Sequence, residues 1–314
     1  MIYALLIFWI ICALFMVHEK KVYRMIIFLS VFSLINSAIF LVAGAADVSM
    51  AEAAAGAFTT IFLLISLEKY YDFDKSRSKK DRKMKIDPKK LIPPILFSGA
   101  LFLLFWYFMP PFSYDNYMKY QYITYFNVDV GGYNPVGAIL LGYRVYDTLF
   151  EALILLVAIV AVKHVSWYDE SYLKDGQHNE VELDPIAVYT IRAISPIILL
   201  FGIAMTTTSL DTPGGGFQGG VILAGFFICR YLIHNVYDIP IKLIALVEKL
   251  IYIAIVLVPV LVIFIGLQTL VPEANLRIFH NAFLTLMNTL LGMKVTCGFI
   301  ILFYRYIVID RRNK

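Results

Sequence analysis

The chain reads Pro213-Gly214-Gly215-Gly216-Phe217-Gln218-Gly219-Gly220 at a point where glycine and proline interrupt long apolar runs. Residues 186–205 before this glycine stretch could cross a bilayer as a helix, and residues 221–233 after it are nearly as apolar. Glycine lowers helix stability and proline fixes the backbone, so the stretch is predicted to be a tight turn or a broken helix between two membrane spans. In lipid, such a backbone is tolerated only where protein or a water-filled cavity surrounds it.

The same glycines also match a nucleotide-binding pattern. Gly214, Gly216 and Gly219 satisfy G-x-G-x-x-G, and Asp238 follows the last of them by 19 residues. That motif requires a short strand before it and a βαβ unit around it, whereas a helix-length apolar span precedes these glycines. The sequence therefore does not predict a nucleotide site, and the glycines are expected to shape the backbone.

The composition is that of a membrane protein. Hydrophobic residues make up 60% of the chain and charged residues 16%, with a mean hydropathy of +0.75. These values exclude an ordinary soluble domain and predict an all-α, polytopic integral membrane protein. The three cysteines, Cys12, Cys229 and Cys297, fall in separate apolar spans, so neither a disulfide nor a metal site is expected. No cofactor is expected in this chain.

About nine transmembrane helices are predicted, and the basic residues predict their orientation. The linker 69–90 holds ten of the 27 lysines and arginines, which places it in the cytoplasm by the positive-inside rule. Counting outward from it puts the amino terminus outside and the carboxyl terminus in the cytoplasm. The first apolar run lacks a signal-peptide cleavage site and is expected to stay as a helix. The expected spans are 2–17, 25–44, 48–67, 91–109, 146–163, 186–206, 217–234, 249–267 and 283–304.

Two polar linkers divide the spans into three groups. Residues 69–90 are basic, and residues 166–185 are rich in aspartate and glutamate. The basic linker is interpreted as a solvated segment that favours anionic membrane lipids, and not as a nucleic-acid site, because aromatic residues are absent from it beyond Phe73. The predicted domains are therefore a three-helix segment at 1–68, a two-helix segment at 91–165 and a four-helix domain at 186–314.

The informative side chains are the charged ones inside spans, since each costs about 2.5–3.5 kcal/mol to insert near the bilayer centre. Asp47 and Glu52 begin the third span among small residues that would let neighbouring helices approach. Lys294 lies near the middle of the last span and is expected to face an acid or a hydrated cavity. Glu248 and Lys249 are interpreted as boundary residues at the cytoplasmic start of the eighth span.

A second charged group begins the fifth span. Arg144, Asp147 and Glu151 are spaced by three and four residues, which places them on one face if a helix runs through all three. The arginine could hold both acids ionised. An interfacial salt bridge between Arg144 and Asp147 explains the pattern equally well, whereas Glu151, one turn deeper, is harder to explain in that way.

Four motifs together resemble a known family. Residues 210–220 resemble the signature of the MnhB-type small subunit of Mrp-type sodium/proton antiporters, and residues 291–295 look like that family's intramembrane lysine segment. Residues 47–57 and 134–151 resemble segments from the carboxyl end of the large subunit of the same antiporters. These pieces are commonly separate small subunits in the related membrane-bound hydrogenases and sulfane-reducing complexes, so the chain looks like their fusion. It departs from the family at Leu210, where a histidine is usual, and at Met50, where a threonine is common.

The resemblance implies a non-catalytic subunit in a prokaryotic cell membrane, within a complex that exchanges sodium for protons. Its implied partners are other antiporter-module membrane subunits and a hydrogenase-like redox arm. A structural subunit that joins antiporter subunits to that arm, without an ion path of its own, is the alternative. The candidates for an ion path are Asp47, Glu52, Arg144, Asp147, Glu151 and Lys294, and the structural signature is Pro213, Gly214, Gly215, Gly216, Gly219 and Gly220.

Overall fold

The computed structural model describes residues 1–19, 21–70, 88–108, 117–165, 185–234, 241–268 and 273–308. Every regular element in these ranges is a helix, which confirms the all-α class. Each of the nine expected spans has a matching helix. These helices are α1 (Ile2–His18), α2 (Val22–Val42), α3 (Ala46–Tyr70), α5 (Pro88–Phe108), α8 (Val145–Val165), α9 (Pro185–Thr207), α10 (Gly216–His234), α11 (Ile241–Gln268) and α12 (Glu273–Val308).

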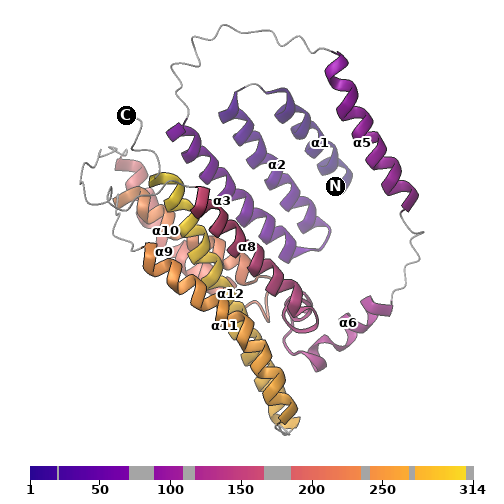
Figure 1. Ribbon diagram of the computed structural model, residues 1–314, viewed down its shortest axis with the longest axis vertical. Helices are drawn as coiled ribbons and strands as arrows, with labels where there is room; N and C mark the ends of the chain where they lie inside the picture. Colours follow the sequence, from indigo (N-terminus) through magenta and orange to yellow (C-terminus); the bar gives the residue numbers. More distant parts are fainter. Residues whose placement is uncertain are drawn as a thin grey trace.

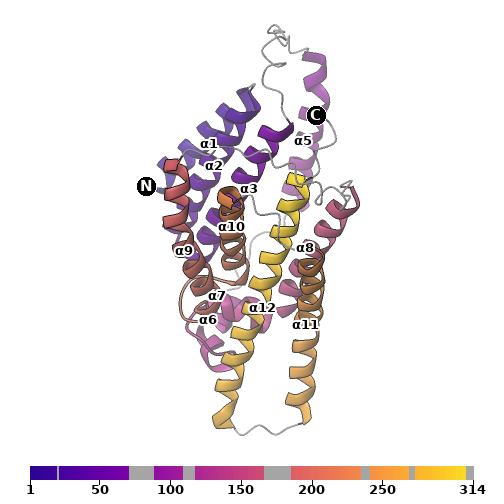
Figure 2. The same ribbon diagram turned by 90° about the vertical axis from the view of Figure 1, so that its left-hand side faces the viewer.

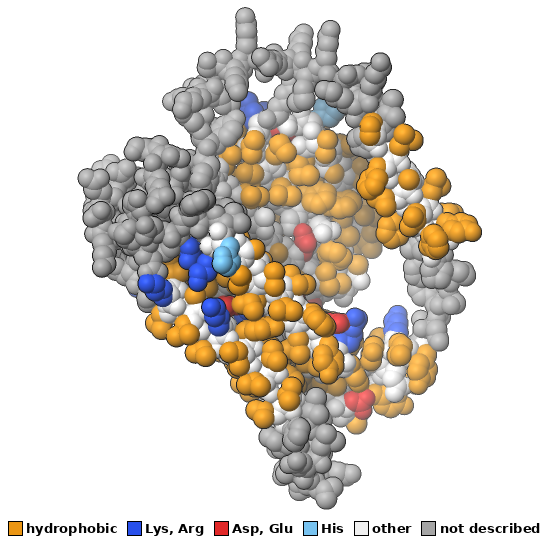
Figure 3. All heavy atoms as spheres, viewed as in Figure 1, with side chains coloured by type: hydrophobic (Ala, Val, Ile, Leu, Met, Phe, Trp, Pro, Cys, Tyr) orange, Lys and Arg blue, Asp and Glu red, His pale blue; other side chains and the backbone are white. Residues whose placement is uncertain are grey.

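Within the described ranges, six helices are long and apolar enough to cross a membrane, namely α2, α3, α8, α9, α11 and α12. The helices α1, α5 and α10 contain shorter apolar stretches. Hydrophobic side chains cover most of the described face in Figure 3, as a lipid-facing surface requires. The protein is therefore a multi-pass membrane protein, while its orientation in the bilayer stays a prediction.

Three further elements were not predicted. The helix α6 (Tyr117–Asp129) is followed by the short α7 (Pro135–Ala138) and the π-helix η1 (Ile139–Tyr143), which leads into α8. Asn134 caps α7 by accepting a hydrogen bond from the Val136 amide at 3.0 Å, with Pro135 at the first helical position. The π-helix ends at Arg144, whose φ of −121° and ψ of 37° are not helical. Arg144 therefore precedes α8 and does not belong to it.

The helix α12 is the centre of the molecule. It packs against α3, α8, α9, α10, α11 and η1, and 61% of its apolar window is buried, against 11–22% for the other five long spans. Figure 2 shows α12 between α10 and α11, with α8 beside them, and Figure 1 shows α1, α2 and α3 as a neighbouring layer. The helix α5 stands away from both groups in Figure 1. A residue on α12 is therefore shielded from lipid on most sides.

The glycine stretch forms a turn after α9 and then the first turns of α10. A Cβ added at Gly216 would collide with the backbone oxygen of Asn288, and one at Gly220 would collide with the backbone oxygen of Gly292. A Cβ at Gly219 would meet α9 at the carbonyl oxygen of Gly202. These glycines let α10 approach the backbones of α12 and α9 closely, as small residues do in membrane helix pairs.

Candidate functional site

A buried ion pair lies at the middle of the helical core. Lys294 on α12 bonds through Nζ to Glu248 Oε1 on α11, and the two side chains are 0% and 2% exposed. The lysine Nζ also lies 4.9 Å from the ring centroid of Tyr252, one turn along α11 from Glu248, in a cation–π arrangement. A lone charge at this depth would be very costly, so each group depends on the other for its stability.

The expectation that Glu248 is a boundary residue is wrong. The helix α11 begins at Ile241, so Glu248 lies about 10 Å inside it at 1.5 Å per residue. The sequence does carry a signal for this, because Ile244, Glu248, Tyr252 and Ile255 recur at intervals of three and four residues. Ile255 is fully buried, so this helical face points into the core and takes Glu248 with it.

Asp47 lies where three segments that are far apart in the sequence meet. It lies in the first turn of α3 and is 8% exposed. Its Oδ1 accepts hydrogen bonds from the Gly214 amide at 2.9 Å and from Asn134 Nδ2 at 3.1 Å. Gln218 Nε2 donates to the Asp47 carbonyl oxygen at 3.3 Å. The glycine stretch therefore supplies a backbone donor to a buried carboxylate, and this hydrogen bond replaces one that water would otherwise make.

Leu210, which stands where the family usually has histidine, takes part in the same region through its backbone. Its carbonyl oxygen accepts from the amides of Tyr133 at 2.8 Å and Asn134 at 2.7 Å, and its side chain is 7% exposed. The leucine thus joins the turn after α9 to the start of α7. These two bonds are independent of the side chain at position 210.

Glu52 lies apart from Asp47, at the contact between α2 and α3. Its Oε1 accepts a hydrogen bond from Ser33 Oγ at 2.7 Å, and the residue is half-buried. Gly56, one turn further along α3, packs directly against Ser33. The structure therefore does not bring Glu52 and Asp47 together.

The group at the fifth span divides into two parts. Arg144 and Asp147 form an ion pair at 2.5 Å, with side chains that are 59% and 49% exposed. This geometry is that of an exposed salt bridge. Because Arg144 precedes α8, the three residues do not share one continuous helix face as the spacing suggested. Glu151 instead lines a cavity that also contains Asp47.

We call this the Asp47 cavity; it has a volume of about 220 Å³. It is lined by the starts of α3, α8 and α10, by η1 and by α12. Thr148 Oγ1 donates a hydrogen bond to the carbonyl oxygen of Leu140, in the π-helix, at 2.8 Å. The carbonyl group therefore has a side-chain donor from α8 as its partner. The oxygen-bearing side chains in its lining are Asp47, Thr148, Glu151, Gln218 and Asn288.

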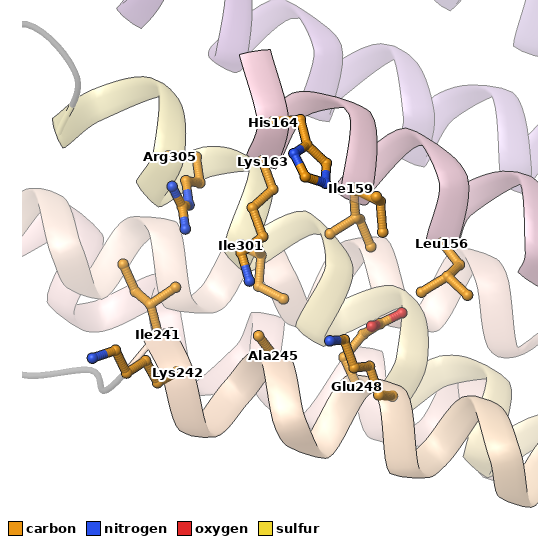
Figure 4. Close-up of a pocket in the computed structure, with 12 residues that line it drawn as sticks. Leu156, Ile159, Lys163, His164, Ile241, Lys242, Ala245, Glu248, Ile301 and Arg305 are labelled. Carbon is orange, nitrogen blue, oxygen red and sulfur yellow. The ribbon is translucent and has the colours of Figure 1, made fainter. Parts of the chain in front are cut away.

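A second cavity, of about 330 Å³, lies between α8, α11 and α12, and we call it the Glu248 cavity. Figure 4 shows Lys163 and His164 from the end of α8, Lys242 from the start of α11 and Arg305 from the end of α12 around it, with Leu156 and Glu248 further along. Apolar residues fill the space between these groups. The cavity therefore leads from the ends of three helices toward the buried ion pair.

The two cavities lie at different levels along the same two helices. On α8, Glu151 belongs to the Asp47 cavity and Leu156 to the Glu248 cavity, which are about 8 Å apart along the helix axis. On α12, Leu291 lines the first cavity and Ile301 the second, and Lys294 lies between them. Glu248 thus lines the second cavity, and its partner Lys294 lies on α12 between the residues that line the two cavities.

No group of three or more histidine, cysteine, aspartate or glutamate residues suited to a resident metal occurs in the parts of the chain that the structure describes. The polar side chains that line the Asp47 cavity or form the buried ion pair are carboxylates, amides, a hydroxyl and one lysine. Carboxylate, carbonyl and hydroxyl oxygens are the ligands that hard cations prefer. Together with the helix lengths, they define a polytopic membrane protein with ionisable groups in its interior.

Comparison with known families agrees with this class. Residues 186–304 match the model of the domain related to the MnhB subunit of Na+/H+ antiporters, and residues 7–71 match the MbhD model, which describes a subunit of MBH. The chain therefore joins an MnhB-related domain and an MbhD domain in one polypeptide. This confirms the resemblance to the MnhB-type subunit and to the small subunits of hydrogenase-type complexes.

An uncharacterized protein of Methanocaldococcus jannaschii is 34% identical over 125 residues, which are 34% of this chain and 45% of that protein. The chain thus covers less than half the length of this relative. Among solved structures, the Mrp complex from Dietzia sp. DQ12-45-1b matches with a TM-score of 0.73 and 16% identity, over 99% of this chain and 35% of the matched chain. The archaeal membrane-bound sulfane sulfur reductase matches with a TM-score of 0.54 and 24% identity, over 68% of this chain and 96% of that one. These two structural similarities show that the chain shares its fold with the matched chains.

Proposed function

We propose that this chain is a non-catalytic membrane subunit of an Mrp-type sodium/proton antiporter module, and that its own charged groups take part in ion translocation. The observation that carries the proposal is the buried Lys294–Glu248 pair, because Glu248 lines the Glu248 cavity and Lys294 lies on α12 between the residues that line the two cavities. A purely structural pair would not need a cavity that reaches one of its members. Intramembrane ionisable groups that line cavities are typical of ion pathways.

The Asp47 cavity is suited to a monovalent cation such as sodium. Asp47 Oδ1 accepts the bonds from Gly214 and Asn134, and neither of these bonds uses Oδ2. Glu151 supplies a second carboxylate, and Thr148 and Gln218 supply neutral oxygens. A cation bound here would lie about 10 Å from Lys294 along α12. Its repulsion with the charged lysine would amount to roughly 2 kcal/mol at an effective dielectric constant near 20. That interaction links occupancy of the cavity to the charge state of the pair.

The ion pair is suited to proton exchange. A proton that reaches Glu248 through its cavity neutralises the carboxylate and leaves the Lys294 cation without its partner, which a buried site disfavours. Lys294 then either gives up its own proton, or pairs again with Glu248 once that carboxylate has lost its proton. Sodium and protons are thus the transported ions, and no cofactor in this chain takes part.

The partners implied by this function are other membrane subunits of the antiporter module and a hydrogenase-like redox arm. The family descriptions of the two domains, an antiporter subunit and an MBH subunit, support this assignment. The alternative is a structural subunit that only assembles such a complex. The Asp47 hydrogen bonds favour that alternative in part, because they join α3, the start of α7 and the glycine stretch whether or not an ion passes.

The deciding experiment measures sodium-dependent proton movement in inverted membrane vesicles that contain the whole complex, together with its assembly on a native gel. Lys294→Ala is expected to abolish exchange while the complex still assembles. Arg144→Gln, which alters an exposed ion pair outside both cavities, is the control and is expected to keep exchange. Wild-type exchange in Lys294→Ala would refute an ion path through this chain. Loss of assembly before any change in transport would support the structural alternative.

A further inference from the structure

The carboxylate of Glu52 has no basic partner within the described part of the chain. Glu52 lies six residues, about 9 Å, inside the apolar span Ala46–Leu67 of α3. Its Oε1 accepts a hydrogen bond from Ser33 Oγ at 2.7 Å, and the ion pairs of the described ranges, such as Lys294 with Glu248, do not include Glu52. A hydroxyl has one hydrogen to donate, so it compensates little of the cost of a charge at this depth.

The side of α3 that carries Glu52 differs from the side that packs on the core. Phe58 is buried in the core, and Ala54 packs against the same cluster. The residues that share a side of the helix with Glu52 follow at spacings of four, three and four, and we call them the Glu52 face: Val48, Glu52, Ala55 and Thr59. Val48 is 45% exposed and Thr59 is also exposed. The Glu52 face is therefore open at both ends to whatever surrounds the chain.

A second polar side chain without a partner lies nearby on α2. Asn36 is three residues beyond Ser33, hence about one helical turn, and is half-buried. The next residue, Ser37, bonds to the Ser49 carbonyl oxygen of α3 at 2.8 Å, so Asn36 lies where α2 runs along α3. In the ranges that the structure describes, its amide side chain makes no hydrogen bond. Lipid tails offer no hydrogen bond to an amide or a carboxylate, so both groups require protein or water beside them.

The residues around Glu52 are small enough for another helix to come close. Positions 51, 53–55 and 57 are alanine, and position 56 is glycine. Gly56 already packs against Ser33 of α2, whereas Ala55 belongs to the Glu52 face. Small residues let the backbones of membrane helices approach, and polar groups between such helices bond across the contact. The layer of α1–α3, which lies beside the core in Figure 1, thus presents a helix-sized surface with one acid in it.

We propose that the Glu52 face docks a transmembrane helix of another subunit, and that a lysine or arginine on this helix pairs with Glu52. Charge complementarity identifies the chemistry of the partner, because a carboxylate within a membrane is stabilised by an opposite charge. Asn36 offers a donor and an acceptor about one turn away. Val48 also lines the Asp47 cavity, so the docked helix borders that cavity. This pairing goes beyond ion exchange and does not depend on it.

The first test identifies the helix that lies on this face. The photo-crosslinking amino acid benzoylphenylalanine replaces Thr59, and the assembled complex is irradiated in membranes before it is purified. Because Thr59 lies about two turns from Glu52, the cross-linked peptide is expected to be a transmembrane segment of another subunit with a lysine or arginine within about three turns of the attachment point. Attachment to lipid alone, or to a helix without a basic residue, would overturn the proposal.

The second test measures how tightly that subunit is held, by dilution of the purified complex and native mass spectrometry. Glu52→Gln is expected to raise the dissociation constant of the subunit by about thirtyfold or more, since the basic group of a desolvated pair is left alone. Glu52→Lys is expected to release the subunit. Replacing the basic residue found by cross-linking with glutamate, in the Glu52→Lys background, is expected to restore binding.

Two variants of this chain serve as controls. Ser33→Ala removes the hydrogen bond within the chain but leaves the charge of Glu52, so the subunit is expected to stay bound. Asp147→Asn removes a carboxylate from an exposed ion pair and is expected to have no effect. Wild-type retention in Glu52→Gln and Glu52→Lys, or equal loss in Ser33→Ala, would overturn the pairing. Neither test measures ion exchange, so failure here and failure of the proposed function are distinguishable.

Discussion

At the scale of single residues, two buried acids, Glu248 and Asp47, have their charges compensated in different ways. Glu248 is compensated by a full opposite charge on Lys294, while Asp47 is compensated by an amide side chain and a backbone amide. In the first arrangement both partners become neutral when a proton moves from the lysine to the carboxylate. The second holds a carboxylate in place through hydrogen bonds to one of its oxygens, Oδ1.

Glu248→Gln is expected to destabilise the protein by about 3–5 kcal/mol, because the buried Lys294 cation loses its charged partner. Combining Glu248→Gln with Lys294→Met removes both charges and is expected to recover most of that stability without recovering ion exchange. Thermal unfolding of the purified complex gives the first quantity and vesicle transport gives the second. Equal stability of the single and double variants would show that the two side chains do not depend on each other.

Asp47→Ala is expected to cost about 3 kcal/mol, since two hydrogen bonds to a charged acceptor are lost and two buried donors are left without it. Asp47→Asn keeps a side-chain oxygen for Gly214 and is expected to unfold at nearly the wild-type temperature while ion exchange falls. Asp147→Asn, at an exposed carboxylate, is the control. If Asp47→Asn transports normally, the charge at position 47 has no part in the ion path.

At the scale of elements, the contact of α10 with α12 determines where the site residues lie. Gly216 and Gly220 face backbone atoms of α12, and Asn288 Oδ1 accepts a hydrogen bond from the Gly216 amide at 2.7 Å. The close contact positions the start of α10 so that Gly214 reaches Asp47. It also keeps the face of α12 that carries Asn288 and Leu291 at the Asp47 cavity.

Gly220→Ala is expected to destabilise the protein by about 1–3 kcal/mol, because its Cβ would overlap the Gly292 carbonyl oxygen and the side chain of Val295. Gly225→Ala on the same helix is the matched control, as nothing lies within 4 Å of its Cβ position. It is expected to stabilise α10 by up to about 1 kcal/mol through helix propensity. Opposite shifts in unfolding temperature would establish that packing, and not propensity, selects glycine at 220. Shifts of the same sign would contradict that view.

At the scale of the whole molecule, the described helices form a core around α12, with a layer of α1–α3 beside it and α5 standing apart. The Asp47 cavity is lined by the first turns of α8, and the Glu248 cavity is lined by its later turns. The orientation that the basic residues predict places the Glu248 cavity toward the cytoplasm and Asp47 near the outer side.

That orientation predicts opposite labelling of two introduced cysteines. Lys119→Cys on α6 is expected to react with a membrane-impermeant maleimide in intact cells, and His164→Cys at the end of α8 only in inverted vesicles. The native Cys12, Cys229 and Cys297 are buried or half-buried within helices, so background labelling is expected to be low. Reaction of both introduced cysteines from the same side would contradict the predicted topology.

The sequence by itself determined the all-helical class, a helix at each of the nine predicted spans and the expectation that Lys294 faces an acid or a cavity, because hydropathy and insertion cost are properties of each residue and its near neighbours in the chain. The match of the glycine and lysine motifs to an MnhB-related domain was also evident from local residues. Only the tertiary structure showed that Glu248 is the partner of Lys294, that Asp47 and Glu151 share a cavity, and that Glu52 and Arg144 lie outside it. The hydrogen bonds around Asp47 join residues up to 171 positions apart. They depend on which helix faces can approach each other, and close packing at residues such as Gly216 and Gly220 determines that approach.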